Sequence, residues 1–306
     1  MCCVIIQSKI VKRFCIAGLS TLSKFANGTR NGHNQFVLIE FYHSICYIII
    51  DNYLLSLDYV QLYWSINMFF LCFSGQDRMT IVRSVLYHLE KYGIITWYDN
   101  HEYVLGDNKK ENYTQAIYNS QYAIVIISRT FSESLGAIEE LDIIKQRYES
   151  GYLHVFPIFY NILANDVPEQ YQWLCDLIYN ELNDSTGSLL TCNQIVCKYY
   201  SDLLSNCQFH SINDLLQYTY EMPSYIVKMI ENYNEIIPSN TNSRIAFLYS
   251  IYLFFEQNTG LPCYLTKSAH YIFQNTKLDL GYDFKEITLM EEIVCLSANH
   301  YIKNNP

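Results

Sequence analysis

The sequence predicts an α/β fold with a parallel sheet, joined to a small all-α region at the C-terminal end. Between residues 68 and 180, short apolar runs such as YAIVII at 122–127 alternate with segments that carry apolar residues at helical spacing. Runs this uniformly apolar are typical of strands buried on both faces. Their alternation with helices through short links favours a parallel sheet that helices cover on both sides.

Four apolar runs of strand length define the predicted sheet, and they lie at Phe69–Phe73, Ile94–Tyr98, Tyr122–Ile127 and His154–Tyr160. Apolar residues at helical spacing predict helices at Thr80–Tyr92, Glu111–Asn119, Leu135–Tyr148 and about Gln170–Tyr179. Gly93 suits the end of the first helix, because glycine readily adopts the left-handed conformation found there. We expect a flavodoxin-like sheet of five strands in the order 2-1-3-4-5.

The fifth strand has the weakest pattern, and we place it at Gln208–Ile212, with a helix at Pro223–Tyr233 that completes the domain. Pro238–Asn242 follows as a linker, since proline, serine and asparagine cluster there. Beyond the linker, apolar residues at helical spacing predict helices at Arg244–Phe255, Tyr264–Asn275 and Phe284–Tyr301. We interpret these helices as a unit that packs or oligomerises.

The expected organisation has three parts, namely a segment of uncertain order at 1–67, an α/β domain at 68–235 with its core at 68–180, and a helical domain at 240–306. In residues 1–67 the apolar residues follow neither helical nor strand spacing for long. An over-extended gene model, with the true start at Met68, therefore stays an alternative. The apolar run at 41–57 raises the question of a membrane span. Asp51 opposes it, because a charge in hydrocarbon is costly.

Charge and cysteine content narrow the class of protein. A formal charge of −10 disfavours nucleic acid as a partner, because binding phosphates needs concentrated lysine and arginine. The eleven cysteines are scattered, often in apolar runs, which indicates buried thiols in a reducing compartment and a cytoplasmic protein. No cysteine pair has the spacing of a structural zinc site, so we expect no metal.

Helices that lie on membranes are the alternative for the C-terminal region, but the basic face they use is missing.

Ligand chemistry is expected at the carboxyl ends of the first and third strands. In an open parallel sheet, ligands bind where adjacent strands send their connections to opposite faces. Ser74 and Gly75 follow the first strand and Ser128 follows the third, so small and polar residues meet there. Glu140 lies on the helix that leaves the third strand, near enough to face the same crevice. The alternative for Glu139 and Glu140 is an exposed acidic face, which the helix dipole favours early in a helix.

Four separated segments resemble the motifs of the TIR (Toll/interleukin-1 receptor) domain, in the family's order and at compatible spacing. They are FLCFSGQDR at 70–78, WYDN at 97–100 with LGD at 105–107, SESLGAIEELDII at 132–144, and FPIFYNILANDVPEQ at 156–170. The third is similar to the segment that presents the family's catalytic glutamate, which falls on Glu140, with Glu139 in place of the usual aspartate. Gly136 and Ala137 stand where the family usually has tryptophan and cysteine, which thins one apolar wall of the site.

The resemblance implies an enzyme that cleaves NAD+ between ribose and nicotinamide, with NAD+ as its substrate, no cofactor and Glu140 as the catalytic carboxylate. One carboxylate suffices, because nicotinamide leaves a cationic pyridinium as a neutral molecule. Glu140 would stabilise the positive charge that develops on the ribose. The product stays open between ADP-ribose and a cyclic ADP-ribose.

Six further residues are expected around the substrate. Ser74, Gly75 and Ser128 are candidates for lining the ribose and phosphate site, and Phe73 or Trp97 for packing near a ring. Plain core packing is the alternative for both aromatic residues, because they lie on apolar strands. Asp99 matches the family's acidic residue at the end of the second strand. The alternative for Asp99 is that it only shapes the loop.

The same resemblance implies self-association through the TIR domain and its BB loop, Asp99–Asp107, and a role in immune or antiviral defence signalling. A non-catalytic adaptor that only assembles partners is the main alternative. The retained Glu140 favours the enzyme, and the missing tryptophan favours the adaptor. A phospho-receiver domain shares the expected topology, but it needs an aspartate where this chain has Ser128.

Overall fold

The computed structural model describes residues 68–99, 105–275 and 283–304, which belong to one compact unit. The interpretations of residues 1–67, including the membrane question at 41–57, lie outside the described residues, as does most of the BB loop. Within the described ranges, no helix combines the length and the apolar character needed to cross a membrane.

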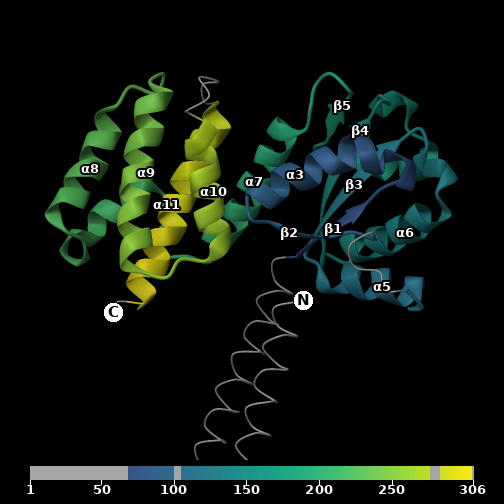
Figure 1. The fold of residues 1–306 in the computed structure, drawn as a ribbon, viewed down its shortest axis with the longest axis horizontal. Coiled ribbons are helices and arrows are strands. Elements are labelled where there is room, and N and C mark those ends of the chain that lie inside the picture. Colours follow the sequence, from purple (N-terminus) through teal and green to yellow (C-terminus); the bar gives the residue numbers. More distant parts are fainter. Residues whose placement is uncertain (1–67, 100–104, 276–282, 305–306) are drawn as a thin grey trace, which may run out of the picture. The chain divides into compact units, whose positions relative to one another are not determined.

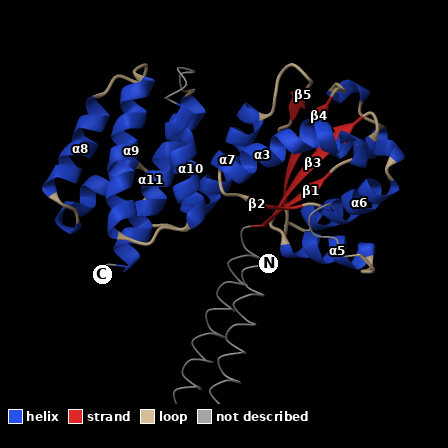
Figure 2. Ribbon diagram, viewed as in Figure 1, coloured by secondary structure: helices blue, strands red, loops and turns tan. Residues whose placement is uncertain are grey.

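Five strands form one parallel sheet in the order β2-β1-β3-β4-β5, which confirms the predicted fold class (Figure 2). They are β1 (Met68–Cys72), β2 (Ile95–Trp97), β3 (Tyr122–Ser128), β4 (His154–Tyr160) and β5 (Asn180–Leu182). The central strand, β3, is buried along its whole length, as its unbroken apolar run predicts.

Helices within the α/β region cover one face of the sheet, which we call the α6 face. Successive strand residues point to opposite sides, so Phe70 and Cys72 of β1 face this side. They form a closed core with α5 (Lys109–Asn119) and α6 (Leu135–Glu149). Leu141 is one of the α6 side chains in this core.

The opposite face, which we call the α7 face, is covered by α3 (Arg83–Lys91) and α7 (Leu189–Leu204). Phe69 and Tyr122 point to this side, and the ring of Tyr199 on α7 packs edge-on against both, with centroid distances of 5.4 and 5.5 Å. Aromatic contacts of this kind add to the free energy that burial alone provides.

The predicted helical region at the C-terminal end is confirmed (Figure 1). Its helices are α9 (Thr241–Asn258), α10 (Cys263–Asn275) and α11 (Phe284–Asn304), and α8 (Ser224–Glu235), which we expected to complete the α/β domain, packs against α9. α11 packs against both α7 and α9. As a result, Ile251 on α9 and Met290 on α11 belong to the same hydrophobic core as the α7 face of the sheet.

The predicted position of the fifth strand is wrong. β5 lies at Asn180–Leu182, where it pairs with β4 at the edge of the sheet. Residues 208–212 form no strand, because the main-chain nitrogens of Gln208 and Phe209 donate to Asn299 Oδ1 on α11, at 2.9 and 3.0 Å. An edge strand of three residues needs little apolar surface, so its sequence gives almost no signal.

Two other elements differ from the prediction. α7 is a helix of 16 residues that we did not predict. The segment expected to be an α-helix near 170–179 instead forms the 3-10 helix η5 (Glu169–Asp176). Because α7 supplies the cover of one sheet face, its omission is the larger error.

Gly93 lies at a close contact between the end of α3 and the start of α10. Its φ is +72°, and a Cβ added there would lie 2.7 Å from Tyr264 Cα. Ser268 Oγ donates to Tyr92 O at 2.8 Å beside this contact. Glycine is therefore required for two reasons, a left-handed backbone and the absence of a side chain.

Candidate active site

The sheet has its switch point between β1 and β3. β1 continues into α3 on the α7 face, whereas β3 continues into α6 on the opposite face. The two strands pair directly, with Cys72 opposite Val125. Connections that diverge in this way leave a crevice at the carboxyl ends of the strands. The residues that follow β1 and end β3 therefore bracket the candidate active site.

The turn after β1 is small and partly open. Ser74 is buried, and its main-chain oxygen accepts a hydrogen bond from Asp77 N at 2.9 Å. This bond closes the short 3-10 helix η1 (Gly75–Asp77). Gly75 is exposed, and a Cβ added to it would meet no atom within 4 Å. The backbone at Gly75 is consequently accessible to a ligand.

Asp77 joins this turn to the end of β3. Ser128 Oγ donates to Asp77 Oδ2 at 2.5 Å, and Thr130 Oγ1 donates to the same oxygen at 3.4 Å. Burial raises the pKa of Asp77, and the two hydroxyl donors oppose the rise. The hydroxyl hydrogen of Ser128 is therefore committed to Asp77, and Ser128 shapes the crevice through that bond.

Arg78 joins the same turn to the end of β2. Its Nη2 atom lies 2.7 Å from Asp99 Oδ2, and each side chain is 27% exposed. The guanidinium also lies over the ring of Phe73, 5.4 Å from its centre. Arg78 Nη1 and Asp99 Oδ1 are buried without a hydrogen-bond partner among the described residues. Within the described residues, the Arg78–Asp99 pair therefore has one hydrogen-bond donor and one acceptor without a partner.

Glu140 lies in the second turn of α6, and only 7% of the residue is exposed. Cys72 Sγ donates to Ala137 O at 3.4 Å, which holds the start of α6 against the end of β1 and places Glu140 beside the thiol. Burial raises the pKa of Glu140 to about 8, Asp99 adds to the rise, and Lys109 and Cys72 oppose it. A carboxyl with a pKa near neutrality beside a crevice is typical of functional sites.

Lys109 lies close to the position where the resemblance shows a missing tryptophan. A Cβ on Gly136 would lie 3.0 Å from Lys109 Nζ. The same ammonium is close enough to favour the ionised form of Glu140. A cation therefore lies beside the thinned apolar wall.

The adjacent Glu139 has a different environment. Its residue is exposed, and its carboxylate accepts a hydrogen bond from Tyr113 on α5 at 2.5 Å. This bond ties α6 to α5. Of the two adjacent glutamates, Glu140 is the one buried at the switch point.

Phe73 and Trp97 are both buried in the cores of the sheet. Phe73 belongs to the core of the α7 face, and Trp97 belongs to the core of the α6 face. The Trp97 ring stacks on Phe70 with a centroid distance of 4.8 Å and an interplanar angle of 13°. The structure thus brings Ser74, Gly75 and Ser128 together through Asp77, whereas the two aromatic rings contribute to packing.

Four residues of this site are absent from the set chosen on sequence, namely Cys72, Asp77, Arg78 and Lys109. Asp77 and Arg78 lie in the motif at 70–78, and polar residues directly after an apolar strand were an available signal. Cys72 and Lys109 become neighbours of Glu140 only when α5 and α6 pack on the sheet. Neither spacing nor composition indicates that contact.

Part of this chain is similar to known proteins. A family model described as "TIR domain" matches residues 69–187. The NAD(+) hydrolase TcpC of Escherichia coli O6:H1 is 31% identical over 110 residues, which cover 35% of this chain and 36% of that protein. The 2' cyclic ADP-D-ribose synthase AbTIR of Acinetobacter baumannii is 28% identical over 120 residues, which cover 39% of this chain and 44% of that protein.

A solved TIR domain was also compared, that of the Toll-related receptor TRR-2 from Hydra magnipapillata. The match covers 37% of this chain and 82% of that chain, with 25% identity and a TM-score of 0.32. With 36% and 44% of TcpC and AbTIR covered, the chain spans less than half the length of these curated relatives.

Proposed function

We propose, on the premise that residues 69–187 belong to the TIR domain family, that this chain cleaves NAD+ between ribose and nicotinamide. Glu140 carries the proposal, because it is a buried carboxyl beside the end of β1 at the switch point of the sheet. The names of two relatives, an NAD(+) hydrolase and a 2' cyclic ADP-D-ribose synthase, support NAD+ as the substrate. A role in defence signalling is part of the same proposal.

The proposed reaction needs one anionic group at the ribose. When the N-glycosidic bond breaks, its electron pair moves to the pyridinium nitrogen, and nicotinamide leaves as a neutral molecule. Positive charge develops on the anomeric carbon, where the ionised carboxylate of Glu140 stabilises it. Water then attacks that carbon and loses a proton to give ADP-ribose, or a nucleophile in the adenosine part of the same molecule attacks and loses a proton to give a cyclic product.

The ionisation of Glu140 couples to substrate binding. Because the pKa of Glu140 is raised to about 8, the ligand-free carboxyl is largely protonated near pH 7. The cationic nicotinamide ring of NAD+ lowers the pKa of a nearby carboxyl, so binding promotes the ionised form. At low NAD+ concentration, turnover is therefore expected to rise as the pH rises toward 8.

In this proposal, some residues around the crevice contact the substrate and others hold the turn after β1 in position. Gly75 leaves room for a phosphate to approach the main chain, and Ser74 lies in the same turn. Asp77 and Ser128 act on the position of that turn, because they are bonded to each other. Arg78, with one guanidinium nitrogen unused among the described residues, is a candidate for contacting a phosphate.

The direct test is nicotinamide release from NAD+ by the purified chain at high protein concentration. We expect Glu140→Gln to lower the rate by about 10²-fold or more, since it removes the charge that stabilises the transition state. Glu149→Gln is the matched control, because Glu149 is exposed at the far end of the same helix. Circular dichroism of both variants checks that the fold is retained.

Two outcomes of this assay contradict the proposal. One is the absence of nicotinamide release by the wild-type chain over a range of protein concentrations. The other is equal release by the wild-type chain and Glu140→Gln. Chromatography of the products distinguishes ADP-ribose from a cyclic product and does not bear on the role of Glu140.

Self-association is a second candidate function, and one observation favours it. Leu105 lies in the predicted BB loop and is fully exposed. A large apolar side chain at that position suits a contact with a second copy. Leu105→Asp is expected to reduce assembly in sedimentation experiments. If Leu105→Asp assembles as the wild type does, the loop does not carry the contact.

A further inference from the structure

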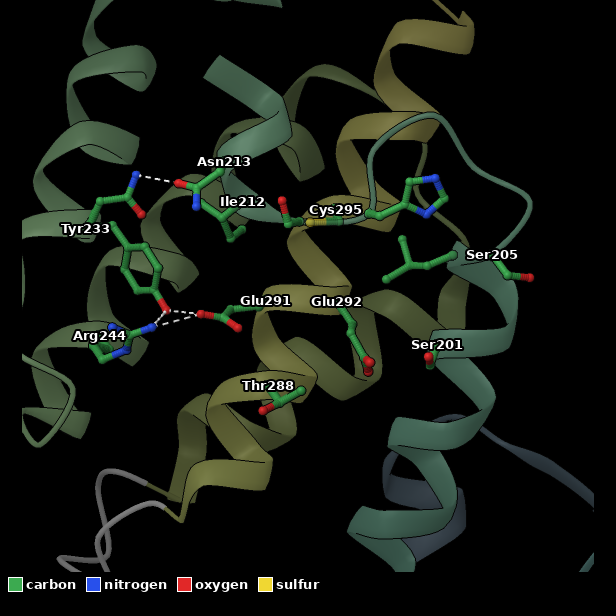
Figure 3. Close-up of a pocket in the computed structure, with 14 residues that line it drawn as sticks. Ser201, Ser205, Ile212, Asn213, Tyr233, Arg244, Thr288, Glu291, Glu292 and Cys295 are labelled. Atoms are coloured by element: carbon green, nitrogen blue, oxygen red, sulfur yellow. Dashed lines mark hydrogen bonds and ion pairs between the residues drawn. The ribbon is translucent and has the colours of Figure 1, made fainter. Parts of the chain in front are cut away.

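A cavity of about 500 Å³ lies among the C-terminal helices, away from the crevice that holds Glu140 (Figure 3). Its lining residues come from α7, α8, α9, α11 and the segment between α7 and α8, and include Ser201, Asn213, Tyr233, Arg244, Glu291 and Glu292. Sites for small molecules have volumes of about 300–1,000 Å³, so this cavity is large enough for one. Nothing in the proposed NAD+ chemistry uses it.

The positive charge in the lining is already neutralised. Arg244 Nη2 lies 2.9 Å from Glu291 Oε1 and also donates to the hydroxyl of Tyr233. The Tyr233 hydroxyl donates to the same carboxylate, and the guanidinium lies 4.4 Å from the centre of the Tyr233 ring. Because Arg244 already has a carboxylate partner, it attracts an anionic ligand less than an unpaired guanidinium would.

The neighbouring Glu292 has no such partner. Figure 3 shows Glu291 directed to Tyr233 and Arg244, and Glu292 directed away from them. Glu292 Oε2 is buried and has no hydrogen-bond partner among the described residues. A buried carboxylate oxygen without a partner is unfavourable, because it has lost water and gained no compensating donor. A cationic or donor-rich ligand would supply that donor.

Three other polar side chains in the lining already donate to acceptors of the protein. Ser205 Oγ donates to Asp202 O at 2.7 Å, and Thr288 Oγ1 donates to Phe284 O at 2.9 Å. Asn234 Nδ2 donates to Asn213 Oδ1 at 2.8 Å. The hydroxyl oxygens of Ser205 and Thr288 keep lone pairs that can accept. These oxygens add to the acceptors that Glu291 and Glu292 supply.

We propose that this cavity binds a small organic cation that carries primary ammonium groups, with the carboxylate of Glu292 as its anchor. The net formal charge of the charged lining groups, two glutamates and one arginine, is −1 with His210 neutral. An alkylammonium group brings three donors and a positive charge to a lining whose own cation, Arg244, is already paired with Glu291. The proposal does not depend on NAD+ cleavage, and its test measures binding alone.

The groups around Glu292 also predict how binding depends on pH. Burial raises the pKa of Glu292 to about 8, Glu291 and Asp202 add to the rise, and Lys285 opposes it. The other charged or titratable groups that line the cavity are His210, Tyr233, Arg244 and Cys295. Because an ammonium group binds the ionised carboxylate, binding releases a proton from Glu292. Affinity is therefore expected to increase between pH 6.5 and pH 8.5, where the amine stays protonated.

The test uses three probes with the same four-carbon length and different ends, namely 1,4-diaminobutane, 1,4-butanediol and succinate. Isothermal titration of the full chain is expected to show one site for the diamine and no measurable binding of the diol or succinate. Glu292→Gln should weaken diamine binding by at least tenfold and remove its pH dependence. Glu235→Gln is the matched control, because it removes an exposed carboxylate from α8 outside the cavity.

A second variant tests the size of the cavity independently of its charge. Ser201→Leu places a larger side chain in the lining and is expected to weaken diamine binding without any change in charge. Thermal melting of each variant shows whether the helical region stays folded. The proposal is overturned by equal binding of the diol and the diamine, by unchanged binding in Glu292→Gln, or by no binding of the diamine. Loss of binding in Glu235→Gln would also overturn it, because it indicates a diffuse attraction to the acidic chain.

Discussion

The two faces of the sheet differ in what covers them. The α6 face is closed by α5 and α6, which lie within the residues that match the TIR domain model. The α7 face is covered by α3 and by α7, and its core continues into the C-terminal helices. Glu140 lies with the closed face, whereas the cavity near Glu292 belongs to the helices that extend the other.

Because of this difference, the residues that the proposed reaction needs and the residues on which folding depends lie in different parts of the chain. The proposed catalytic crevice needs only the ends of β1 and β3, the turn at 74–78 and the start of α6. The α7 face needs residues far along the chain before its apolar side chains are buried. We therefore expect changes in the C-terminal helices to affect folding first, and changes on α6 to affect the site with little effect on folding.

Removal of residues 240–306 is expected to have the largest effect. It deletes α9, α10 and α11, so the apolar residues of α7 and α8 that pack against them become exposed. A shortened chain should lose cooperative melting and aggregate, because large apolar surfaces then meet water. Circular dichroism and analytical ultracentrifugation measure both. A shortened chain that stays monomeric with an unchanged melting temperature would show that the two faces are independent.

Tyr199→Ala is expected to have the next largest effect. It removes a buried ring that packs on Phe69 and Tyr122, and such a cavity typically costs about 3–5 kcal/mol of unfolding free energy. Tyr199→Phe keeps the ring and serves as the control. Urea unfolding gives both values. Comparable losses in the two variants would mean that the hydroxyl, and not the ring, holds α7 to the sheet.

Glu140→Gln should produce a smaller effect on stability, with a pH dependence of its own. The folded pKa of about 8 lies above the ordinary value of 4.5, so the folded chain holds this proton between those two pH values. The resulting stability is complete below pH 4.5 and is lost as the pH rises through 8. The variant should therefore match the wild type near pH 4.5 and be the more stable protein at pH 8.5, where the wild type has to bury an ionised carboxylate. Urea unfolding across this pH range measures the difference in unfolding free energy, with Glu149→Gln as control. A difference that stays constant with pH would contradict the burial of Glu140.

The sequence predicts the α6 face better than the α7 face. The strands of the sheet interior and the helix of Glu140 follow from unbroken apolar runs and from helical spacing within a short stretch of chain. β5 escapes prediction because an edge strand of three residues, two of them polar, lacks such a run. In α7, the buried residues Cys192, Val196 and Tyr199 follow helical spacing, so a signal was present and was not used.

The site could be predicted in position and not in detail. Strand order and the location of Ser74, Ser128 and Glu140 follow from the topology of parallel sheets. The bond between Asp77 and Ser128 and the approach of Lys109 to position 136 depend on side-chain packing. A one-dimensional pattern does not encode such contacts, because each joins residues from separate elements.

Gly93 sets the distance between the end of α3 and the start of α10. With hydrogen as its side chain, it lets the start of α10 rest directly on the turn that follows α3. A single methyl group there would act as a wedge and force the two helices apart. One position thus controls how closely the start of α10 approaches α3 within the hydrophobic core that both helices share.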